Sequence, residues 1–220
     1  MTDAPYDAVA AEYAARVPAD PNASPTVEGI AARYLLAACG DVAGRRVLDL
    51  GCGEGHLARR VCALGGEVTG LDLSGELLRI ARQRSPGIEY IQGDAQRLRA
   101  FVDATFDLVY SNLALMDIPD LAAVYGAVHR VLRPGGRLVF TLVHPCFSPP
   151  GADVLTDGDG RFVARLVRRY TEEGFWRSDG VGTIRSIVGA HHRMLSTYIN
   201  TLLTSGFRLR GLAEPTLSAD

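Results

Sequence analysis

Lysine is absent from the chain, because all 23 of its basic residues are arginines. This absence excludes chemistry that needs a lysine amine, such as a Schiff base with the substrate or the lysine of a phosphate-binding P-loop. The arginines are outweighed by 25 acidic residues, and the formal net charge is -2. A chain of this charge has no overall basic surface for a phosphate backbone, so we expect no nucleic-acid partner.

Cysteine and long apolar runs are also scarce. The four cysteines follow none of the close paired spacings that are typical of zinc sites. No apolar run is long enough to cross a bilayer, and the first residues lack the basic region and apolar stretch of a secretory leader. We therefore expect a reduced, cytoplasmic protein that has no metal site and no membrane partner.

Strand-like and helix-like segments alternate between residues 41 and 144. The expected strands are 46–50, 67–73, 88–93, 106–112 and 136–144, and the expected helices are 55–65, 74–84 with Ser74 as N-cap, and 118–132 with Pro119 in its first turn. Such alternation predicts an α/β fold with a doubly wound, mostly parallel sheet that helices cover on both faces.

The first expected strand runs into VLDLGCGEGHLARR, residues 47–60, where three glycines occupy alternate positions. Glycine lets a ligand approach the backbone closely, and the helix that follows directs free amide N–H groups toward an anion. A dinucleotide-binding G-x-G-x-x-G turn needs glycine where this chain has His56. Asp49, two residues before Gly51, would repel a pyrophosphate but hold an ammonium group. S-adenosylmethionine has an ammonium group, a carboxylate and no phosphate, so we expect it as the ligand.

Two further carboxylates follow the next two expected strands. Asp72 is placed to accept hydrogen bonds from both ribose hydroxyls, although a site for NAD would use an acid here too. Asp94 is placed to accept a hydrogen bond from the adenine amine. Singly, Asp49 could cap a turn, Asp72 a helix, and Asp94 could be a surface acid. Only their combination with the glycines favours one ligand.

With these motifs the sequence resembles the class I S-adenosylmethionine-dependent methyltransferases. The resemblance extends from about Tyr6 to Pro215 and is carried by VLDLGCGEG, GLDLS, GDAQRL, FDLVYSNLAL and VLRPGGRLVF. It implies a Rossmann-like sheet of seven strands, with the last strand antiparallel. It implies cofactor contacts from Asp49, Gly51 and Gly53 at the methionine end, Asp72 at the ribose, Leu73, Asp94 and Ala95 at the adenine, Ser111 and Asn112 near the reacting methyl group, and Tyr13 folded over the cofactor.

The C-terminal part departs from the family pattern. The family normally has two strands after the last helix, expected here over 194–207, but only 207–212 reads as a strand. Either the chain is truncated or another strand-like segment, 183–188, has entered the sheet, so the final strand is in doubt. The single expected domain, 1–220, then comprises an N-terminal helical lid (1–40), a cofactor-binding core (41–144), an acceptor-side insertion (145–189) that includes a strand-like stretch at 161–170, and a last helix and strand (190–220).

The range of possible methyl acceptors is narrowed mainly by motifs of other methyltransferases that this sequence lacks. After the expected fourth strand, YSNLA stands where adenine- and glutamine-directed enzymes have an Asn/Asp-Pro-Pro-aromatic run. The fourth and fifth strands end without carboxylates, so we expect no magnesium. The segment 145–189 is too long for a simple connection and favours a pocket wall. We expect a small-molecule acceptor, whose acceptor atom could be oxygen, nitrogen or carbon. The oligomeric state stays open.

Several residues of the second half are candidates for the chemistry. His144, at the end of the expected fifth strand, is a candidate general base, because an imidazole titrates near neutral pH. The alternative is a hydrogen-bonded histidine that merely ends a strand. Candidate acceptor contacts are Trp176, His192, Arg193 and Tyr198. For Trp176 the alternative is ordinary packing under a long loop.

Two rival functions remain beside a metal-independent methyltransferase. One is a methyltransferase-like protein that binds the cofactor without catalysis and serves as a regulatory or scaffolding subunit. The other is an NAD-linked oxidoreductase, which Asp49 and His56 disfavour.

Overall fold

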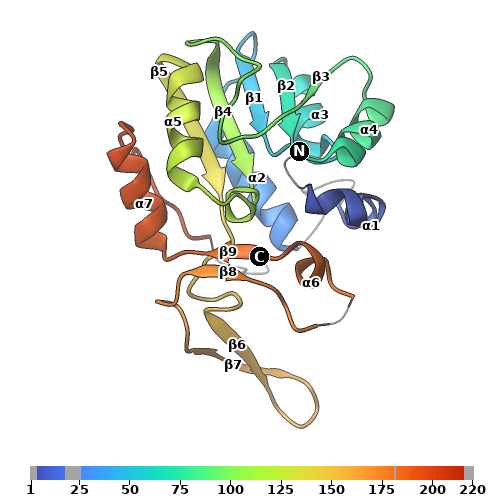
Figure 1. The fold of residues 1–220 in the computed structure, drawn as a ribbon, viewed down its shortest axis with the longest axis vertical. Coiled ribbons are helices and arrows are strands. Elements are labelled where there is room, and N and C mark those ends of the chain that lie inside the picture. The colour runs from blue at the N-terminus through green and yellow to red at the C-terminus, as the bar shows by residue number, and fades with distance from the viewer. Residues whose placement is uncertain (1–3, 18–25, 181, 216–220) are drawn as a thin grey trace.

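A five-stranded parallel sheet forms the centre of the molecule (Figure 1) in a computed structural model that describes residues 4–17, 26–180 and 182–215. The strand order is β3-β2-β1-β4-β5. The strands are β1 (Arg46–Leu50), β2 (Glu67–Asp72), β3 (Glu89–Gln92), β4 (Phe106–Asn112) and β5 (Leu132–Thr141). The α/β fold with a doubly wound parallel sheet is thereby confirmed, with the strand order changing direction at β1.

Helices cover both faces of the sheet because the strand side chains alternate between two apolar cores. Val47 and Leu108 pack with α2 (Val27–Cys39) and α3 (His56–Ala63) on one face. Leu48 and Val109 belong to the core on the other face, which the remaining helices complete. The helices on this second face are α5 (Leu121–Val131) and α7 (Leu195–Thr204). On the first face, α4 (Gly75–Arg84) packs with α3 in a third apolar cluster. Burial of both faces explains why the central strands β1 and β4 are mostly apolar.

Two helix starts show how local side-chain chemistry sets the element bounds. The Ser74 hydroxyl accepts a hydrogen bond from the Leu77 amide at 3.1 Å, which confirms the predicted N-cap of α4. The start of α5 differs from the prediction, because Asp120 is the N-cap and accepts from the Ala123 amide at 2.9 Å. Pro119 therefore precedes the cap instead of lying in the first turn.

Strand β5 begins four residues earlier than its sequence pattern indicates. Leu132 already pairs with Phe106, and the register then shifts so that Leu108 faces Arg137. The Arg-Pro-Gly-Gly sequence that resembles an isolated turn lies within this irregular stretch of the strand. A proline can occupy such a bulge because no ladder hydrogen bond is required of it there.

The N-terminal segment lies at the carboxyl ends of the strands. It consists of a 3₁₀ helix (Pro5–Val9) followed by α1 (Ala10–Arg16), within the region that was predicted as a helical lid. Figure 1 shows α1 beside this edge of the sheet, on the same side as α6 (Ile184–Val188) and the β8–β9 pair. The predicted lid thus faces the edge where ligands of doubly wound sheets bind.

The segment after β5 contains two small antiparallel sheets. The hairpin of β6 (Ala152–Thr156) and β7 (Phe162–Val167) projects from the body of the molecule, as Figure 1 shows. Strand β8 (Gly174–Trp176) pairs with β9 (Ala190–His192), which joins the two ends of the segment beneath the main sheet. Only β7 coincides with a strand-like stretch of the sequence.

Two predicted strands are wrong. Residues 184–188 form α6, because Thr183 caps the first turn, its hydroxyl accepting from the Ser186 amide at 3.1 Å, and Gly189 ends the helix with φ 69°. Residues 207–215 follow α7 without forming a strand. Within the described ranges the central sheet therefore has five strands where the family resemblance implied seven. No helix among these residues combines the length and apolarity needed to span a membrane.

Candidate functional site

The glycine turn after β1 has a backbone that other residues adopt only with strain. Gly51, Gly53 and Gly55 have φ values of 75°, 54° and 78°. A Cβ added to Gly51 would lie 2.5 Å from the Cβ of Ala114, so the turn and the segment after β4 are in close contact. Gly55 is also the N-cap of α3. The tight turn and the helix start that the sequence pattern indicated are thus confirmed, and the approach of a ligand to them stays a prediction.

A small crevice of about 60 Å³, which we call the crevice below, lies at this turn between β1, β4 and the N-terminal segment. Its lining includes Tyr13, Asp49, Gly51, Glu54, His56 and Asn112. Four of these, Tyr13, Asp49, Gly51 and Asn112, are residues for which a cofactor contact was predicted. Glu54 and His56 were not predicted as site residues.

Asp49 is an acid buried beneath the glycine turn. It is 2% exposed, and burial raises its pKa to about 7, against the opposing effect of the Tyr110 hydroxyl. Asp49 and Tyr110 are register partners on β1 and β4, which brings their side chains together. A cation bound beside Asp49 would favour its ionised form and return the pKa toward its ordinary value.

Three buried polar atoms of the crevice residues have no hydrogen-bond partner within the described part of the chain. They are Asp49 Oδ2, Glu54 Oε1 and His56 Nε2. A buried polar atom without a partner costs about 1–3 kcal/mol, so such atoms are rare unless a ligand satisfies them. Two of the three are carboxylate oxygens, and their natural complement is a cation with several N–H donors. The ammonium group of S-adenosylmethionine meets this requirement.

Asp72 braces the glycine turn from the end of β2. One of its carboxylate oxygens accepts from the Gly53 amide at 2.8 Å, and the other accepts from the Ser74 amide at 2.9 Å. Burial raises its pKa, while these backbone hydrogen bonds act in the opposite direction. The predicted ribose contact stays a prediction, and it is compatible with the free lone pairs of both oxygens.

Tyr13 covers the turn from the N-terminal side. A Cβ added to Gly53 would lie 3.5 Å from Tyr13 Cε1, and the Tyr6 ring meets Tyr13 edge-on at 5.5 Å. The Tyr6 hydroxyl donates to Asp117 at 2.8 Å, and Asp117 also accepts from Arg185 of α6. Tyr13, which was predicted to fold over the cofactor, is therefore positioned by contacts with the glycine turn and with the Tyr6 ring.

The adenine-side candidates lie outside the crevice. Asp94 accepts from both the backbone and side-chain amides of Gln96, at 2.9 and 3.0 Å, as a local loop acid does. Leu73 is half-buried at the end of β2, and Ala95 packs against the apolar core beneath α5. Their assignment to the adenine stays a prediction.

The two residues at the end of β4 have different surroundings. Ser111 is fully buried and its hydroxyl donates to the Leu50 carbonyl at 2.9 Å, which ties β4 to β1. Asn112 lines the crevice and accepts from the Thr141 hydroxyl at 2.7 Å, which fixes its amide orientation. Asn112 is therefore the better placed of the two for the predicted contact with a ligand.

His144 follows β5 and uses both ring nitrogens. Its Nδ1 accepts from the Cys146 amide at 3.2 Å, so Nε2 carries the proton and donates to Glu214 at 2.7 Å. The ring also stacks on Phe147 at 4.8 Å between centroids. The sequence placed His144 at the correct end of β5, but the carboxylate partner from the C-terminal segment could not be foreseen. Its catalytic role stays a prediction.

The predicted acceptor contacts have structural partners in the described chain. The buried His192 is hydrogen-bonded through Nε2 to the Tyr170 carbonyl at 2.9 Å. Arg193 donates to the Ile118 and Pro119 carbonyls at 2.7 and 2.6 Å and lies over the Tyr198 ring. Tyr198 belongs to the core beside α5, and Trp176 pairs with Ala190 between β8 and β9. Binding of the acceptor by these residues stays a prediction.

Among residues 4–17, 26–180 and 182–215, no three His, Cys, Asp or Glu side chains gather as a metal ion would require.

Comparison with known proteins agrees with this geometry. Residues 48–140 match the family described as a methyltransferase domain. The chain is also 35% identical to an S-adenosylmethionine-dependent methyltransferase from Mesorhizobium loti of known crystal structure. That match covers 87% of this chain and 84% of the other, with a TM-score of 0.73.

Two curated relatives match over part of the chain. A malonyl-[acyl-carrier protein] O-methyltransferase of Pseudescherichia vulneris is 43% identical over 110 residues, which are 50% of this chain and 43% of that protein. A ubiquinone biosynthesis O-methyltransferase of Xanthomonas oryzae pv. oryzae (strain PXO99A) is 36% identical over 135 residues, or 60% and 55% of the two chains. The chain spans about half the length of the curated relatives it matches. The extent of the Mesorhizobium loti match and the observed fold establish that the chain belongs to the class I S-adenosylmethionine-dependent methyltransferases, with S-adenosylmethionine as its cofactor.

Proposed function

We propose that this protein transfers a methyl group from S-adenosylmethionine to a small-molecule acceptor without a metal ion. The observation that carries the proposal is the pair of buried carboxylate oxygens, Asp49 Oδ2 and Glu54 Oε1, that lie unpartnered among the described residues at the glycine turn. Such a pair complements a zwitterion that carries an ammonium group, and it would repel a pyrophosphate. It therefore supports S-adenosylmethionine over NAD.

The chain's own residues would hold the cofactor from three sides. Asp49 and Glu54 are the proposed partners of the ammonium group, Tyr13 would exclude water from above, and Asp72 is the proposed ribose partner. When bound, S-adenosylmethionine supplies a methyl group on a sulfonium, which is reactive enough that positioning is the main task of the protein. Asn112, oriented by Thr141, is the proposed polar group at the reacting end.

His144 is the proposed base for an acceptor that must lose a proton. Within the described part of the chain its Nδ1 accepts from the Cys146 amide alone, at 3.2 Å, a long hydrogen bond that an acceptor hydroxyl could replace. A proton gained at Nδ1 would leave an imidazolium that donates from Nε2 to Glu214. The carboxylate would stabilise this cation, as in other carboxylate–histidine pairs.

The proposed acceptor atom is an oxygen, because both curated relatives described above are named as O-methyltransferases. The segment after β5, with β6 to β9 and α6, is the proposed wall of the acceptor pocket. This segment is the part in which a class of acceptors would be selected, because loops carried on a rigid sheet vary most freely.

Binding and turnover test the proposal separately. Thermal unfolding with S-adenosylmethionine, S-adenosylhomocysteine or NAD should show stabilisation by the first two only, and stabilisation by NAD alone would overturn the assignment. A labelled-methyl assay against small phenols, carboxylic acids and amines should then show turnover with an oxygen acceptor. Cofactor binding without turnover on the whole panel would favour a regulatory or scaffolding subunit instead.

A further inference from the structure

Asp117 is a partly buried acid that has no role in the proposed methyl transfer. It ends a short 3₁₀ helix (Leu115–Asp117) that follows β4. Its Oδ2 accepts from the Tyr6 hydroxyl at 2.8 Å, and its Oδ1 accepts from Arg185. Tyr6 belongs to the N-terminal segment, and Arg185 belongs to α6 in the segment after β5. Asp117 therefore joins two parts of the molecule that are far apart in the sequence.

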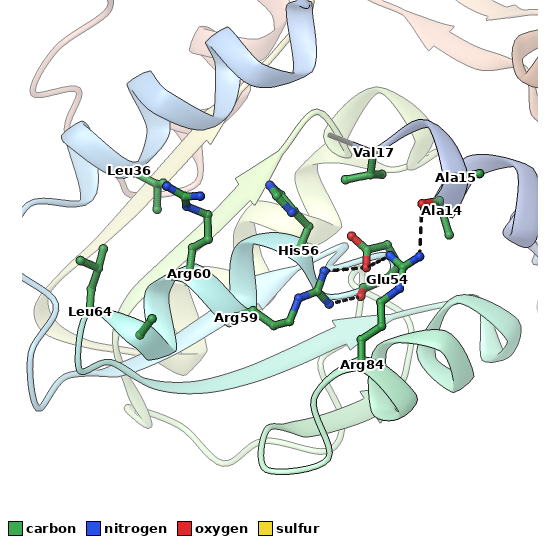
Figure 2. Close-up of a pocket in the computed structure, with 11 residues that line it drawn as sticks. Ala14, Ala15, Val17, Leu36, Glu54, His56, Arg59, Arg60, Leu64 and Arg84 are labelled. Carbon is green, nitrogen blue, oxygen red and sulfur yellow. Dashed lines mark hydrogen bonds and ion pairs between the residues drawn. The ribbon is translucent and has the colours of Figure 1, made fainter. Parts of the chain in front are cut away.

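The N-terminal segment depends on tertiary contacts for its position. We call its 3₁₀ helix (Pro5–Val9) and α1 together the lid. The first of these helices has no side-chain cap, and helices this short are marginal by themselves. Two attachments of the lid come from α4 and its cap. Asp7 accepts from the Ser74 hydroxyl at 2.6 Å, and Arg84 donates to the Ala14 carbonyl at 3.4 Å. Figure 2 shows the Arg84 side chain extending from α4 to Ala14 in α1.

The hydrogen bond between Tyr6 and Asp117 attaches the lid at a different place. It fixes the Tyr6 ring, which meets the Tyr13 ring edge-on at 5.5 Å between centroids. Tyr13 in turn lines the crevice and lies against Gly53 of the glycine turn. Direct contacts thus lead from Asp117 through Tyr6 to the residue that is proposed to cover the cofactor.

Arg185 is the contact of Asp117 on the other side. It also donates to the Gly189 carbonyl at 2.8 Å, which ties Arg185 to the end of its own helix. The next residue, Ala190, begins β9 and pairs with Trp176 of β8. Among the described residues, none from α6 lines the crevice. An effect of Arg185 on the cofactor must therefore be transmitted through other side chains.

The two contacts of Asp117 support each other electrostatically. Burial raises the pKa of Asp117, whereas Arg185 and the Tyr6 hydroxyl act in the opposite direction. Arg185 thus favours the ionised carboxylate, and an ionised carboxylate accepts a stronger hydrogen bond from a hydroxyl than a neutral acid does. The contact with Tyr6 should therefore weaken when Arg185 is displaced, because networks of this kind are cooperative.

We propose that Asp117 is a positioning residue that couples the lid to the segment after β5. Through Tyr6 it holds Tyr13 over the cofactor, and it does so fully while Arg185 is in place. This inference rests on the proposed position of the cofactor beneath Tyr13. By linkage, an acceptor that orders α6 would also strengthen cofactor binding, and bound cofactor would favour the ordered α6. The cofactor would then be covered most tightly when the acceptor wall is assembled.

Calorimetric titration of the full chain with S-adenosylhomocysteine tests the coupling without turnover. Tyr6→Phe removes the hydroxyl but keeps the ring, and Arg185→Gln removes the charge that favours ionised Asp117. Each variant should bind S-adenosylhomocysteine about five- to tenfold more weakly, as expected for loss of a hydrogen bond to a charged group. Arg168→Gln is the matched control. It removes an exposed ion pair with Asp153, at 3.8 Å, in the same segment and should leave the affinity unchanged.

A double variant distinguishes coupling from two separate losses. If Tyr6 and Arg185 act through Asp117, the protein with both Tyr6→Phe and Arg185→Gln should bind within about twofold of the weaker single variant. Asp117→Asn, which keeps the side-chain volume, should match the double variant. Arg185→Lys keeps the charge and should bind within about threefold of the unsubstituted protein. Additive losses in the double variant would overturn the coupling, and so would Arg185→Gln binding as tightly as Arg168→Gln or Arg185→Lys binding as weakly as Arg185→Gln.

Tyr13→Ala separates failure of this inference from failure of the proposed function. It should weaken S-adenosylhomocysteine binding about tenfold or more if Tyr13 covers the cofactor. Unchanged binding in Tyr13→Ala would contradict the proposed position of the cofactor and, with it, this inference. Weakened binding in Tyr13→Ala together with unchanged binding in both Tyr6→Phe and Arg185→Gln would overturn this inference alone.

Discussion

The two halves of this molecule are held together by different kinds of interaction. In the half from β1 to β5, alternating apolar side chains fill two cores, and polar residues occur where the strands end. In the segment after β5, two small sheets are attached by a few specific contacts, such as those of Arg185 with Asp117 and of Arg193 with the Ile118 carbonyl. The first kind repeats with the period of the secondary structure. The second kind joins residues about 70 positions apart, so it leaves no local pattern in the sequence.

The difference has a consequence for function. The glycine turn and its acids are built on strands that are covered on both faces, which makes the cofactor end of the site rigid. The segment proposed to select the acceptor includes a β6–β7 hairpin with exposed apolar side chains, among them Val154, Phe162 and Val163. A two-stranded hairpin is marginally stable alone, so this part can change shape or sequence at little cost to the core.

The largest expected effect is in the cofactor half, at Asp49. Asp49→Asn removes the buried negative charge proposed to face the ammonium group and should weaken S-adenosylhomocysteine binding by about a hundredfold, as loss of one partner of a buried ion pair does. Calorimetric titration measures it. Asp103→Asn, at an exposed acid of the loop before β4 with no assigned role in binding, is the matched control and should leave the affinity unchanged. Equal losses in both variants would contradict the assignment of the crevice.

The next largest effect should be at the junction of the two halves, on turnover. His144→Ala should lower kcat about a hundredfold with little change in cofactor affinity, because general-base catalysis contributes about 10²–10⁴. Glu214→Gln should lower kcat less, since it removes the stabilisation of the imidazolium but not the base. Steady-state kinetics with the acceptor identified in the labelled-methyl assay measures kcat for both variants. Turnover of His144→Ala within a few-fold of the unsubstituted protein would remove His144 from the catalytic residues.

Replacement of Arg193 tests whether this residue of the second half has a structural role or contacts the acceptor. Arg193→Ala leaves the Ile118 and Pro119 carbonyls without their donor and should lower the free energy of unfolding by about 3 kcal/mol. Urea unfolding measures this loss, with the exposed Arg33→Ala as control. Unchanged stability combined with a raised KM for the acceptor would instead place Arg193 in the acceptor pocket.

Among the effects on binding and turnover, the smallest expected one is the dependence of cofactor affinity on pH. With the Asp49 pKa at about 7 in the free protein, binding of the cation requires loss of a proton below that pH. S-adenosylhomocysteine should therefore bind about tenfold more weakly at pH 6 than at pH 8. Titrations at both values measure this, and Asp49→Asn should show no such change.

The raised pKa of Asp49 also predicts how the stability of the free protein depends on pH. Stability should fall as pH rises, whereas cofactor affinity should rise. The folded protein retains the Asp49 proton up to pH 7, whereas the unfolded chain loses it near pH 4, so stability falls as pH rises between these values. Asp49→Asn should consequently be the more stable protein at pH 8 by a few kcal/mol, of the order of three pKa units. The difference should vanish near pH 4. Equal urea unfolding of the two proteins at pH 8 would show that Asp49 is not desolvated as described.

Most of the cofactor half could be predicted from the sequence, because its determinants are local. Strands 46–50 and 106–112 were predicted with their observed bounds, and Ser74 was recognised as a cap. Residues 184–188 show the opposite case. Their β-branched residues favour a strand, but the Thr183 cap and Gly189 make them a helical turn. Glu54 and His56 were missed because neither residue type is required by the glycine pattern, and only their burial beside the crevice marks them.

By itself the sequence determined the parallel sheet, the glycine turn and the acids at the strand ends, because apolar periodicity and glycine conformation act over a few residues at a time. Only the tertiary structure decided where β5 begins, that no strand follows α7 before residue 216, and which side chains meet across the chain. The Glu54–Arg84 pair and the His144–Glu214 pair join residues 30 and 70 positions apart. Such contacts depend on how whole elements pack, and that packing is set by the sum of many weak apolar interactions that no single stretch of sequence encodes.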